Sequence, residues 1–551
     1  MRTKATSDVW WKNAVMYCVD VETFLDSDGD GCGDLVGLTD RIDYLGGLGV
    51  SCLWLMPFYP SEQRDDGYDI TDFYGVDGRL GTPGDFAELL RTAADRGIRV
   101  IADLVVNHTS DQHPWFQAAR DPSSSYHDFY VWSQEKPPEK PGDVVFPDRE
   151  KSNWAWDAKA RAYYLHKFYS HQPDLNIANP AVRDELAQVV GYWLDQGLAG
   201  FRVDAVPFLL EPTGLPDGAV HDPHELLRDL RRFIGRRRGD AILMGEVNLP
   251  PEGQREFFGD EDGDELHMIL SFVVNQAVYL ALAREDATPL REALESLPEI
   301  PEDCQWANFV RNHDELTLDK LSGEERAEVF AAFGPEEHLQ LYGRGLRRRL
   351  PTMLGGDERR IRMLYSLAFA LPGTPVLFYG EEIGMAENLA IEGRYSVRAP
   401  MQWSSERHGG FTTGDEPCRP VVDAEGWGAE RVNVAAQRRD AGSLLSWMER
   451  LIRRRRECPE LGWGVCTLLD AGHPAVLAHR SDWDGSAILA LHSFSGERRE
   501  VSVAVGEDVT EAVDLFGTGN LAPEGGAVRV ALDPFGYAWF RLRRDGQRVA
   551  P

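Results

Sequence analysis

The chain has 551 residues, which is more than one hydrophobic core usually serves, so we expect a large domain accompanied by a smaller one. Its composition of 43% hydrophobic and 27% charged residues is typical of a globular protein. The formal net charge of −32 argues against nucleic acids and anionic membranes as partners, because both require a basic surface. A small neutral substrate is compatible with this charge.

Targeting signals and disulfides are not expected. The first 20 residues contain no apolar segment of signal-peptide length, and no run of 18 apolar residues predicts a membrane span. The seven cysteines are odd in number, irregularly spaced and free of CxxC pairs. We therefore expect free, mostly buried thiols in a cytoplasmic protein. The sequence does not specify an oligomeric state.

Short apolar runs alternate with amphipathic helices over most of the chain. Thr82-Pro83 and Asn179-Pro180 each begin a helix, which Gly97 and Gly197 end, and Asp222-Pro223 begins a third. Such alternation predicts a parallel sheet covered by helices. Eight units favour a (β/α)8 barrel over an open sheet, and no GxGxxG motif follows any strand. The predicted strands are 15–20, 51–57, 99–106, 200–206, 241–247, 267–272, 306–311 and 374–380.

This pattern divides the chain into four parts. Residues 1–107 and 173–460 form the barrel, and residues 108–172, which lack a clear helix pattern, form an inserted domain B. Residues 316–360 are a charged insertion with a partly helical pattern within the second part. The helix at 443–457 closes the barrel, and we expect its four arginines at 453–456 to be solvated. Residues 461–551 alternate in short runs and predict an antiparallel β domain.

Acidic residues gather where four of the predicted strands end. In a barrel of this kind, functional groups project from the carboxyl ends of the strands, so these residues converge on one mouth. The residues at these ends are Asp103, Asn107, His108, Arg202, Asp204, Glu246, Asn312, His313, Asp314 and Glu315. Convergence of so many carboxylates is improbable if each were only a helix cap or a solvated loop residue.

Two carboxylates in one pocket suit glycoside cleavage, in which an acid protonates the leaving oxygen and a carboxylate meets the anomeric carbon. Strand alternation places Arg202 and Asp204 on one face, and the arginine should lower the pKa of Asp204. Partial desolvation should raise the pKa of Glu246. Tyr68, Phe168 and Trp306 could stack on sugar faces. A catalytic transition metal is disfavoured, because no HExxH, CxxC or histidine-rich spacing occurs.

A second pattern, DSDGDGCGD at 26–34, resembles the first half of a calcium-binding loop. Asp26, Asp28 and Asp30 alternate, and Gly31 permits a sharp turn. The position where an EF-hand has glutamate is Gly37, so this is not an EF-hand. Asp34 would complete a smaller site together with the Cys32 carbonyl.

Five motifs, taken in order, resemble those of the α-amylase superfamily, glycoside hydrolase family 13. They are DGYDI (66–70), DLVVNH (103–108), GFRVDA (200–205), GEVN (245–248) and RNHDE (311–315). Longer stretches, among them FYSHQPDLN (168–176), SVRAPMQW (396–403) and ERVNVAAQ (430–437), are most similar to the trehalose synthase group. The resemblance covers nearly the whole chain.

The resemblance implies roles for individual residues. Asp204 would be the nucleophile, Glu246 the general acid/base, and Asp314 a carboxylate that binds sugar hydroxyls more strongly in the transition state. Arg202 would position the nucleophile. The remaining implied substrate-binding residues are His108, His313 and Phe168 around the glucosyl unit, and Asp65, Tyr68 and Arg398 at the non-reducing end.

The resemblance also implies structural cations. A Ca²⁺ or Mg²⁺ ion would lie on the 26–34 loop, and a second Ca²⁺ would join domain B to the barrel through Asn107, Asp174 and Glu211.

Three functions are compatible with these residues and motifs. The favoured one is a retaining enzyme that hydrolyses or transfers glucose from short α-glucosides such as maltose, trehalose, sucrose or small maltooligosaccharides. The alternative is a trehalose synthase, which isomerises maltose to trehalose, and a remote one is a non-catalytic sugar-binding member. Segments 211–224, 248–250 and 411–414 depart from the trehalose synthase pattern and would flank the leaving group.

Overall fold

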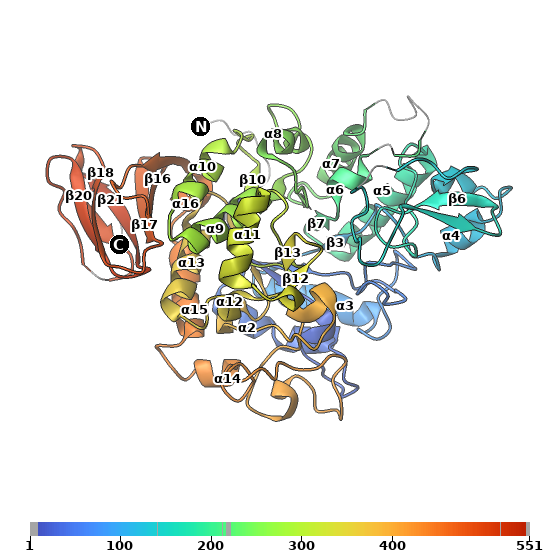
Figure 1. The fold of residues 1–551 in the computed structure, drawn as a ribbon, viewed down its shortest axis with the longest axis horizontal. Coiled ribbons are helices and arrows are strands. Elements are labelled where there is room, and N and C mark those ends of the chain that lie inside the picture. Colours follow the sequence, from blue (N-terminus) through green and yellow to red (C-terminus); the bar gives the residue numbers. More distant parts are fainter. Residues whose placement is uncertain (1–8, 140–141, 212, 216–221, 518, 547–551) are drawn as a thin grey trace.

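Eight parallel strands close into a barrel in the computed structural model of the chain, which describes residues 9–139, 142–211, 213–215, 222–517 and 519–546 (Figure 1). All eight predicted strands are confirmed, although each is shorter than expected. Around the barrel they run in the order β1-β14-β10-β9-β8-β7-β3-β2. Their bounds are β1 Met16–Val19, β2 Cys52–Leu55, β3 Arg99–Leu104, β7 Gly200–Val203, β8 Ile242–Gly245, β9 Met268–Leu270, β10 Gln305–Phe309 and β14 Thr374–Phe378.

Helices surround the barrel as the amphipathic pattern predicts. Thr82 caps α3 with a reciprocal capping box, and Asn179 caps α5, each followed by proline in the first turn. The third predicted helix begins three residues after Asp222. The barrel helices of at least six residues are α1 Leu35–Asp40, α2 Ile42–Leu48, α3 Pro83–Asp95, α5 Pro180–Gln196, α7 Glu225–Arg237, α9 Phe272–Arg284, α10 Thr288–Ser296, α13 Glu358–Ala370 and α15 Leu444–Arg456. Shorter ones are α6 Val206–Leu209, α8 Pro251–Gln254, α14 Val434–Gln437 and α16 Glu460–Trp463.

The chain between β3 and β7 forms a small sheet at the side of the barrel. Strands β4 Trp132–Ser133, β5 Trp154–Asp157 and β6 Ala162–Leu165 pair antiparallel in the order β4-β6-β5. A helix, α4 Pro114–Ala119, precedes them, so the expected lack of a helix here was wrong. His113 caps that helix through its imidazole, and Pro114 starts it, a signal that the aromatic composition of the segment obscured.

A second excursion follows β10. It contains β11 Leu316–Thr317, α11 Gly323–Phe333, β12 Gln340–Leu341, β13 Gly345–Leu346 and α12 Leu350–Met353. The three short strands form a sheet in the order β11-β13-β12. Helix α11 begins with a capping box between Ser322 and Glu325, as expected for a charged, helical insertion.

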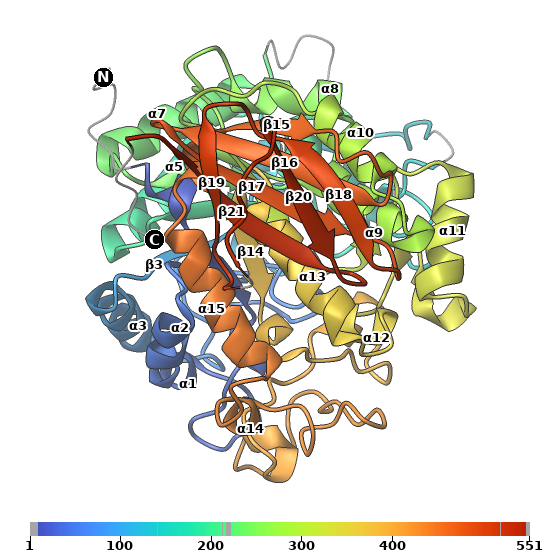
Figure 2. The ribbon, with the colours of Figure 1, turned by 90° about the vertical axis from the view of Figure 1, so that its left-hand side faces the viewer.

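The C-terminal part is the predicted antiparallel β domain and lies beside the barrel (Figures 1 and 2). One sheet has the order β15-β16-β17-β21-β19, and β18 pairs with β20. The bounds are β15 Val465–Leu469, β16 Val476–Trp483, β17 Ser486–Ser493, β18 Arg499–Ala504, β19 Val509–Asp514, β20 Ala527–Leu532 and β21 Tyr537–Arg544. Side chains of both sheets share a hydrophobic core of their own.

The arginine run at the end of α15 is not uniformly solvated, contrary to our expectation. Arg455 is fully buried and donates hydrogen bonds to the Gly373 carbonyl at 2.9 Å and to Asn13 Oδ1 at 3.1 Å. Arg453 and Arg456 are exposed. Helical spacing turns only Arg455 toward the barrel, where the Gly373 carbonyl and the Asn13 side chain accept hydrogen bonds from its guanidinium.

All seven cysteines are free and five are buried, as the sequence predicts. Among the described residues, the structure has no helix with the length and apolar character that a bilayer crossing requires.

Candidate active site

Three neighbouring strands of the barrel carry the charged residues at the centre of the site. Asp103 lies within β3 and pairs in register with Arg202 of β7, so both side chains share one face of the sheet. Asp204 directly follows β7, and Glu246 directly follows β8. The backbone turns away at Ala205, which has the left-handed angles φ 48° and ψ 40°. Strand β7 therefore ends at Val203, three residues earlier than predicted.

Arg202 connects three carboxylates and is only 1% exposed. Its Nη1 donates to Asp103 Oδ1 at 2.6 Å and to Asp204 Oδ1 at 2.7 Å. Its Nη2 donates to Glu246 Oε2 at 2.6 Å, an interaction that the sequence did not predict. One buried guanidinium thus fixes the relative positions of Asp204 and Glu246.

Burial controls the protonation of these two carboxyl groups. It raises the pKa of Asp204 to about 6 and that of Glu246 to about 7, although Arg202 acts in the opposite direction on both. The expectation for Glu246 agrees with this result. The lowered pKa expected for Asp204 was wrong, because loss of solvation outweighs the arginine. Glu246 nevertheless holds its proton to higher pH than Asp204, as an acid must.

Asp314 has a different environment. Arg398 Nη2 donates to Asp314 Oδ1 at 2.7 Å, and Arg394 Nη1 lies 3.1 Å from the same oxygen. Burial would raise the pKa of Asp314, but Arg394, His313 and Arg398 hold it well below its ordinary value. Asp314 is therefore a fixed anion beside a pair that can exchange a proton.

The other predicted residues divide between the wall of the site and the layer behind it. A cavity of about 1100 Å³ is lined by Asp65, Tyr68, His108, Phe168, Asp204, Glu246 and Asp314, among others. Arg202, His313 and Arg398 are at most 1% exposed and lie behind that wall. His313 Nε2 lies 2.8 Å from the Tyr68 hydroxyl, which places His313 as a support for Tyr68.

Trp306 does not belong to the site. It is the second residue of β10, at the amino end of the strand, and packs edge-on against Phe258 with ring centroids 5.2 Å apart. Phe168 does line the cavity, and its ring centroid is 5.2 Å from that of His108.

Arg394 was not among the residues expected from the sequence, which also gave no ion-pair partner for Asp65. Asp65 Oδ1 accepts hydrogen bonds from Arg394 Nη2 at 2.5 Å and from the Tyr395 hydroxyl at 2.8 Å, whereas Arg398 pairs with Asp66 and Asp314. Arg394 also lines the cavity. Its spacing of four residues from Arg398 was a visible signal, but only the folded chain shows which arginine reaches which aspartate.

The 26–34 loop has a donor set that suits a hard cation. Carboxylate oxygens of Asp26, Asp28 and Asp34 lie within 4.8 Å of one another, and Asp26 is buried. Asp30 is exposed and its Oδ1 accepts from the Cys32 amide at 2.7 Å. The three grouped residues therefore fit a Ca²⁺ or Mg²⁺ ion, which would stabilise the loop.

The residues expected to hold a second calcium ion are arranged differently. Asn107 Nδ2 lies 3.3 Å from Asp174 Oδ1, but the Glu211 carboxylate pairs with Lys167 Nζ at 2.7 Å. A lysine ammonium thus takes the position of a cation beside Glu211, and this set does not fit a shared divalent ion. Part of the atypical 211–224 segment, residues 212 and 216–221, lies outside the described residues.

Comparison with known proteins identifies the enzyme family to which the chain belongs. The model of the α-amylase catalytic domain matches residues 19–333 and 346–464, and that of the sucrose hydrolase-like C-terminal domain matches residues 485–541. The chain belongs to the α-amylase family, glycoside hydrolase family 13, and is an enzyme of its α-glucosidase, transglucosidase or trehalose synthase groups.

Among the relatives that match this chain are two trehalose synthases and a trehalulose synthase of known structure. The chain is 40% identical to a trehalose synthase of Pimelobacter sp., covering 97% of this chain and 96% of that protein. It is also 40% identical to a trehalose synthase/amylase of Mycolicibacterium smegmatis, over 98% and 94%. A trehalulose synthase structure from Pseudomonas mesoacidophila superposes with a TM-score of 0.78 at 27% identity, over 97% of this chain and 99% of that one.

Proposed function

We propose that the protein is a retaining enzyme that transfers the glucosyl unit of maltose within the active site to form trehalose. The observation that carries the chemistry is the double contact of Arg202, which holds Asp204 and Glu246 together. Similarity to trehalose synthases over nearly the whole chain supports this reaction over the hydrolysis and transfer that the sequence favoured.

The charges of the site support a double displacement. Asp204 attacks the anomeric carbon while Glu246 gives its proton to the leaving oxygen, which forms a glucosyl-Asp204 ester and releases the second glucose. That glucose turns, and its anomeric hydroxyl attacks the ester as Glu246 takes the proton back. Asp314, which Arg394 and Arg398 hold ionised, accepts hydrogen bonds from hydroxyl groups of the glucosyl unit.

Hydrolysis or transfer to another sugar is the second candidate. The cavity of about 1100 Å³ has space for water or a larger acceptor beside a disaccharide, since it exceeds the roughly 300–1,000 Å³ of ordinary small-molecule sites.

We also propose a structural Ca²⁺ on the 26–34 loop, held by Asp26, Asp28 and Asp34. The proximity of their oxygens supports it. A cytoplasmic location is proposed on the cysteine content of the sequence alone.

The deciding experiment is product analysis with maltose in the presence of excess isotopically labelled glucose. Unlabelled trehalose with little unlabelled free glucose is the expected result, because the released glucose stays in the cavity. Unlabelled free glucose as the main product would instead support hydrolysis. Lack of turnover on maltose, trehalose and sucrose would contradict both candidates.

A further inference from the structure

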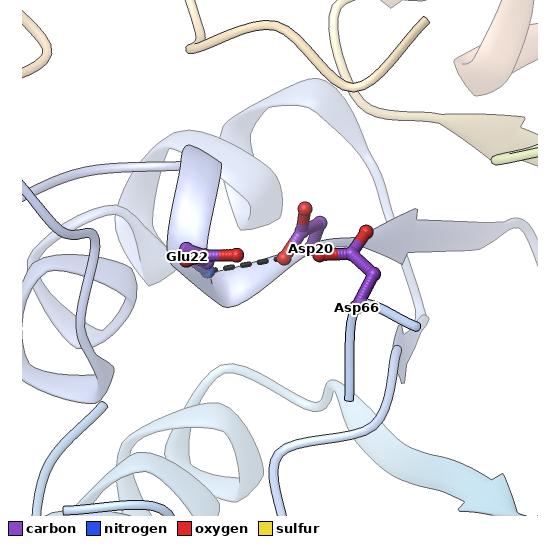
Figure 3. A group of neighbouring side chains, drawn as sticks. All are labelled: Asp20, Glu22 and Asp66. Carbon is purple, nitrogen blue, oxygen red and sulfur yellow. Dashed lines mark hydrogen bonds between the residues drawn. The ribbon is translucent and has the colours of Figure 1, made fainter. Parts of the chain in front are cut away.

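Three carboxylates meet beneath the non-reducing side of the site. Asp20 directly follows β1, Glu22 lies in the 3₁₀ turn η2 Val21–Thr23, and Asp66 lies in the loop after β2. Figure 3 shows the side chains of Asp20 and Asp66 close together with Glu22 beside them, and one oxygen of each lies within 4.8 Å of the others. Without a cation, such carboxylates would repel one another.

A guanidinium from a distant loop supplies that cation. Arg419 Nη2 contacts Asp66 and lies 2.9 Å from Glu22 Oε2, while Nη1 lies 3.9 Å from Asp20 Oδ2. The Arg419 side chain is 15% exposed. Because it occupies the position where a metal would bind, this cluster is an internal ion network of the chain.

Asp66 is shared between Arg419 and the active site. Its Oδ1 pairs with Arg419, and its Oδ2 pairs with Arg398 Nη1. Arg398 in turn donates to Asp314 Oδ1 at 2.7 Å and to the His313 carbonyl at 2.7 Å. The contacts therefore run without interruption from Arg419 to Asp314.

The backbone conformation of Asp66 makes the position of its carboxylate depend on its two arginine partners. Asp66 has φ 54°, a left-handed conformation that non-glycine residues keep only where the surrounding structure holds them. Arg398 and Arg419 each pair with one oxygen of its carboxylate. Loss of one would free Asp66 to move and carry Arg398 with it.

The loop that bears Arg419 is itself anchored. The Cys418 amide donates to the Gly31 carbonyl at 2.6 Å, and the Asp26 amide donates to the Phe411 carbonyl at 3.0 Å. Arg419 is therefore presented by a segment fixed on the 26–34 loop. An exposed arginine of the same region, Arg407, pairs with the exposed Asp415 and has no such connection to Asp66.

We propose that Arg419 is a positioning residue, which holds Asp66 against Arg398 and thereby orients Asp314 toward the glucosyl unit. This inference rests on the proposed function, because it assumes that Asp314 binds the sugar. It also assumes that this binding strengthens in the transition state, so misplacing Asp314 should affect kcat more than KM.

The test compares R419M with the wild-type protein and with R407M as matched control, by steady-state kinetics on maltose and by thermal unfolding. We expect R419M to lower kcat about 10- to 100-fold, to change KM less than about threefold and to melt within a few degrees of wild type. R407M should match wild type in all three quantities.

R419Q serves if R419M does not fold, because glutamine keeps one hydrogen bond to Asp66 without the charge. R419K should restore part of kcat, since it keeps a charge but lacks the planar fork that spans Glu22 and Asp66. Wild-type kcat in a folded R419M or R419Q, or a kcat in R419K no higher than in R419Q, overturns the inference alone. Inactivity of the wild-type protein overturns the proposed function and this inference with it.

Discussion

Arg202 donates to Glu246 at 2.6 Å from the same guanidinium that donates to Asp204 at 2.7 Å. The residue expected to activate the nucleophile thus also holds the acid. Because Asp204 is buried and Glu246 is largely shielded from solvent, a single cation between them permits one proton to be shared by the pair. The first two predictions, on the nucleophile Asp204 and on the pH dependence of the reaction, follow from this arrangement.

Replacing the nucleophile should abolish turnover. We expect D204A to lower kcat on maltose by about 10³-fold or more, since no ester can form. Thermal unfolding monitored by circular dichroism checks that the variant is folded. Substantial activity in a folded D204A protein would exclude the covalent mechanism.

The pH dependence should be bell-shaped with a maximum between about pH 6 and pH 7. Asp204, with a pKa of about 6, must be ionised, so kcat/KM falls as the pH drops through that value. Glu246, with a pKa of about 7, must be protonated, so kcat/KM falls as the pH rises through it. The measurement is kcat/KM across pH 4–9. In E246Q, assayed with an aryl glucoside that needs no acid to leave, the alkaline limb should disappear; its persistence would argue against this assignment.

Arg394 should be essential although the sequence did not single it out. It contacts Asp65 at 2.5 Å and Asp314 at 3.1 Å, so R394M removes a charge shared by two carboxylates of the cavity. We expect kcat/KM for maltose to fall about 100-fold, together with weaker inhibition by glucose. R96M is the control, because Arg96 forms an exposed pair with Asp43. Equal kinetics in R394M and R96M would refute the role.

Chelation should destabilise the protein through the 26–34 loop. Binding at 100 times Kd contributes about 2.7 kcal/mol, so treatment with EDTA should lower Tm by a few degrees, and added Ca²⁺ should restore it. In D28N the Tm should be lower and should respond little to EDTA. A wild-type Tm that does not respond to EDTA would count against the ion.

Buried and exposed arginines of one helix end should differ in their effect on stability. R455M removes the donors to Gly373 and Asn13 and should lower the free energy of unfolding by ~3 kcal/mol. R453M, at an exposed position two residues earlier, should change it by less than about 0.5 kcal/mol. Denaturant unfolding of both variants measures the difference. Similar values would show that the hydrogen bonds of the buried Arg455 do not stabilise the fold.

Local patterns in the sequence were sufficient for the barrel. Strand positions follow from apolar runs, and helix starts from caps such as Thr82 and Asn179, because these signals act between residues near one another in the chain. They did not identify α4 or the early end of β7 at Val203, where a cap and a left-handed residue set the boundary.

The sequence by itself determined the barrel, the C-terminal β domain and the strand ends that bring Asp204, Glu246 and Asp314 to one cavity. Only the tertiary structure decided which cation serves which anion: Arg394 with Asp65, Arg398 with Asp66 and Asp314, Arg419 with the cluster behind them, and Lys167 with Glu211. It also decided that burial raises the pKa of Asp204 despite Arg202. The physical reason is that hydrophobic periodicity is local, whereas ion pairing and desolvation depend on groups that meet from distant parts of the chain.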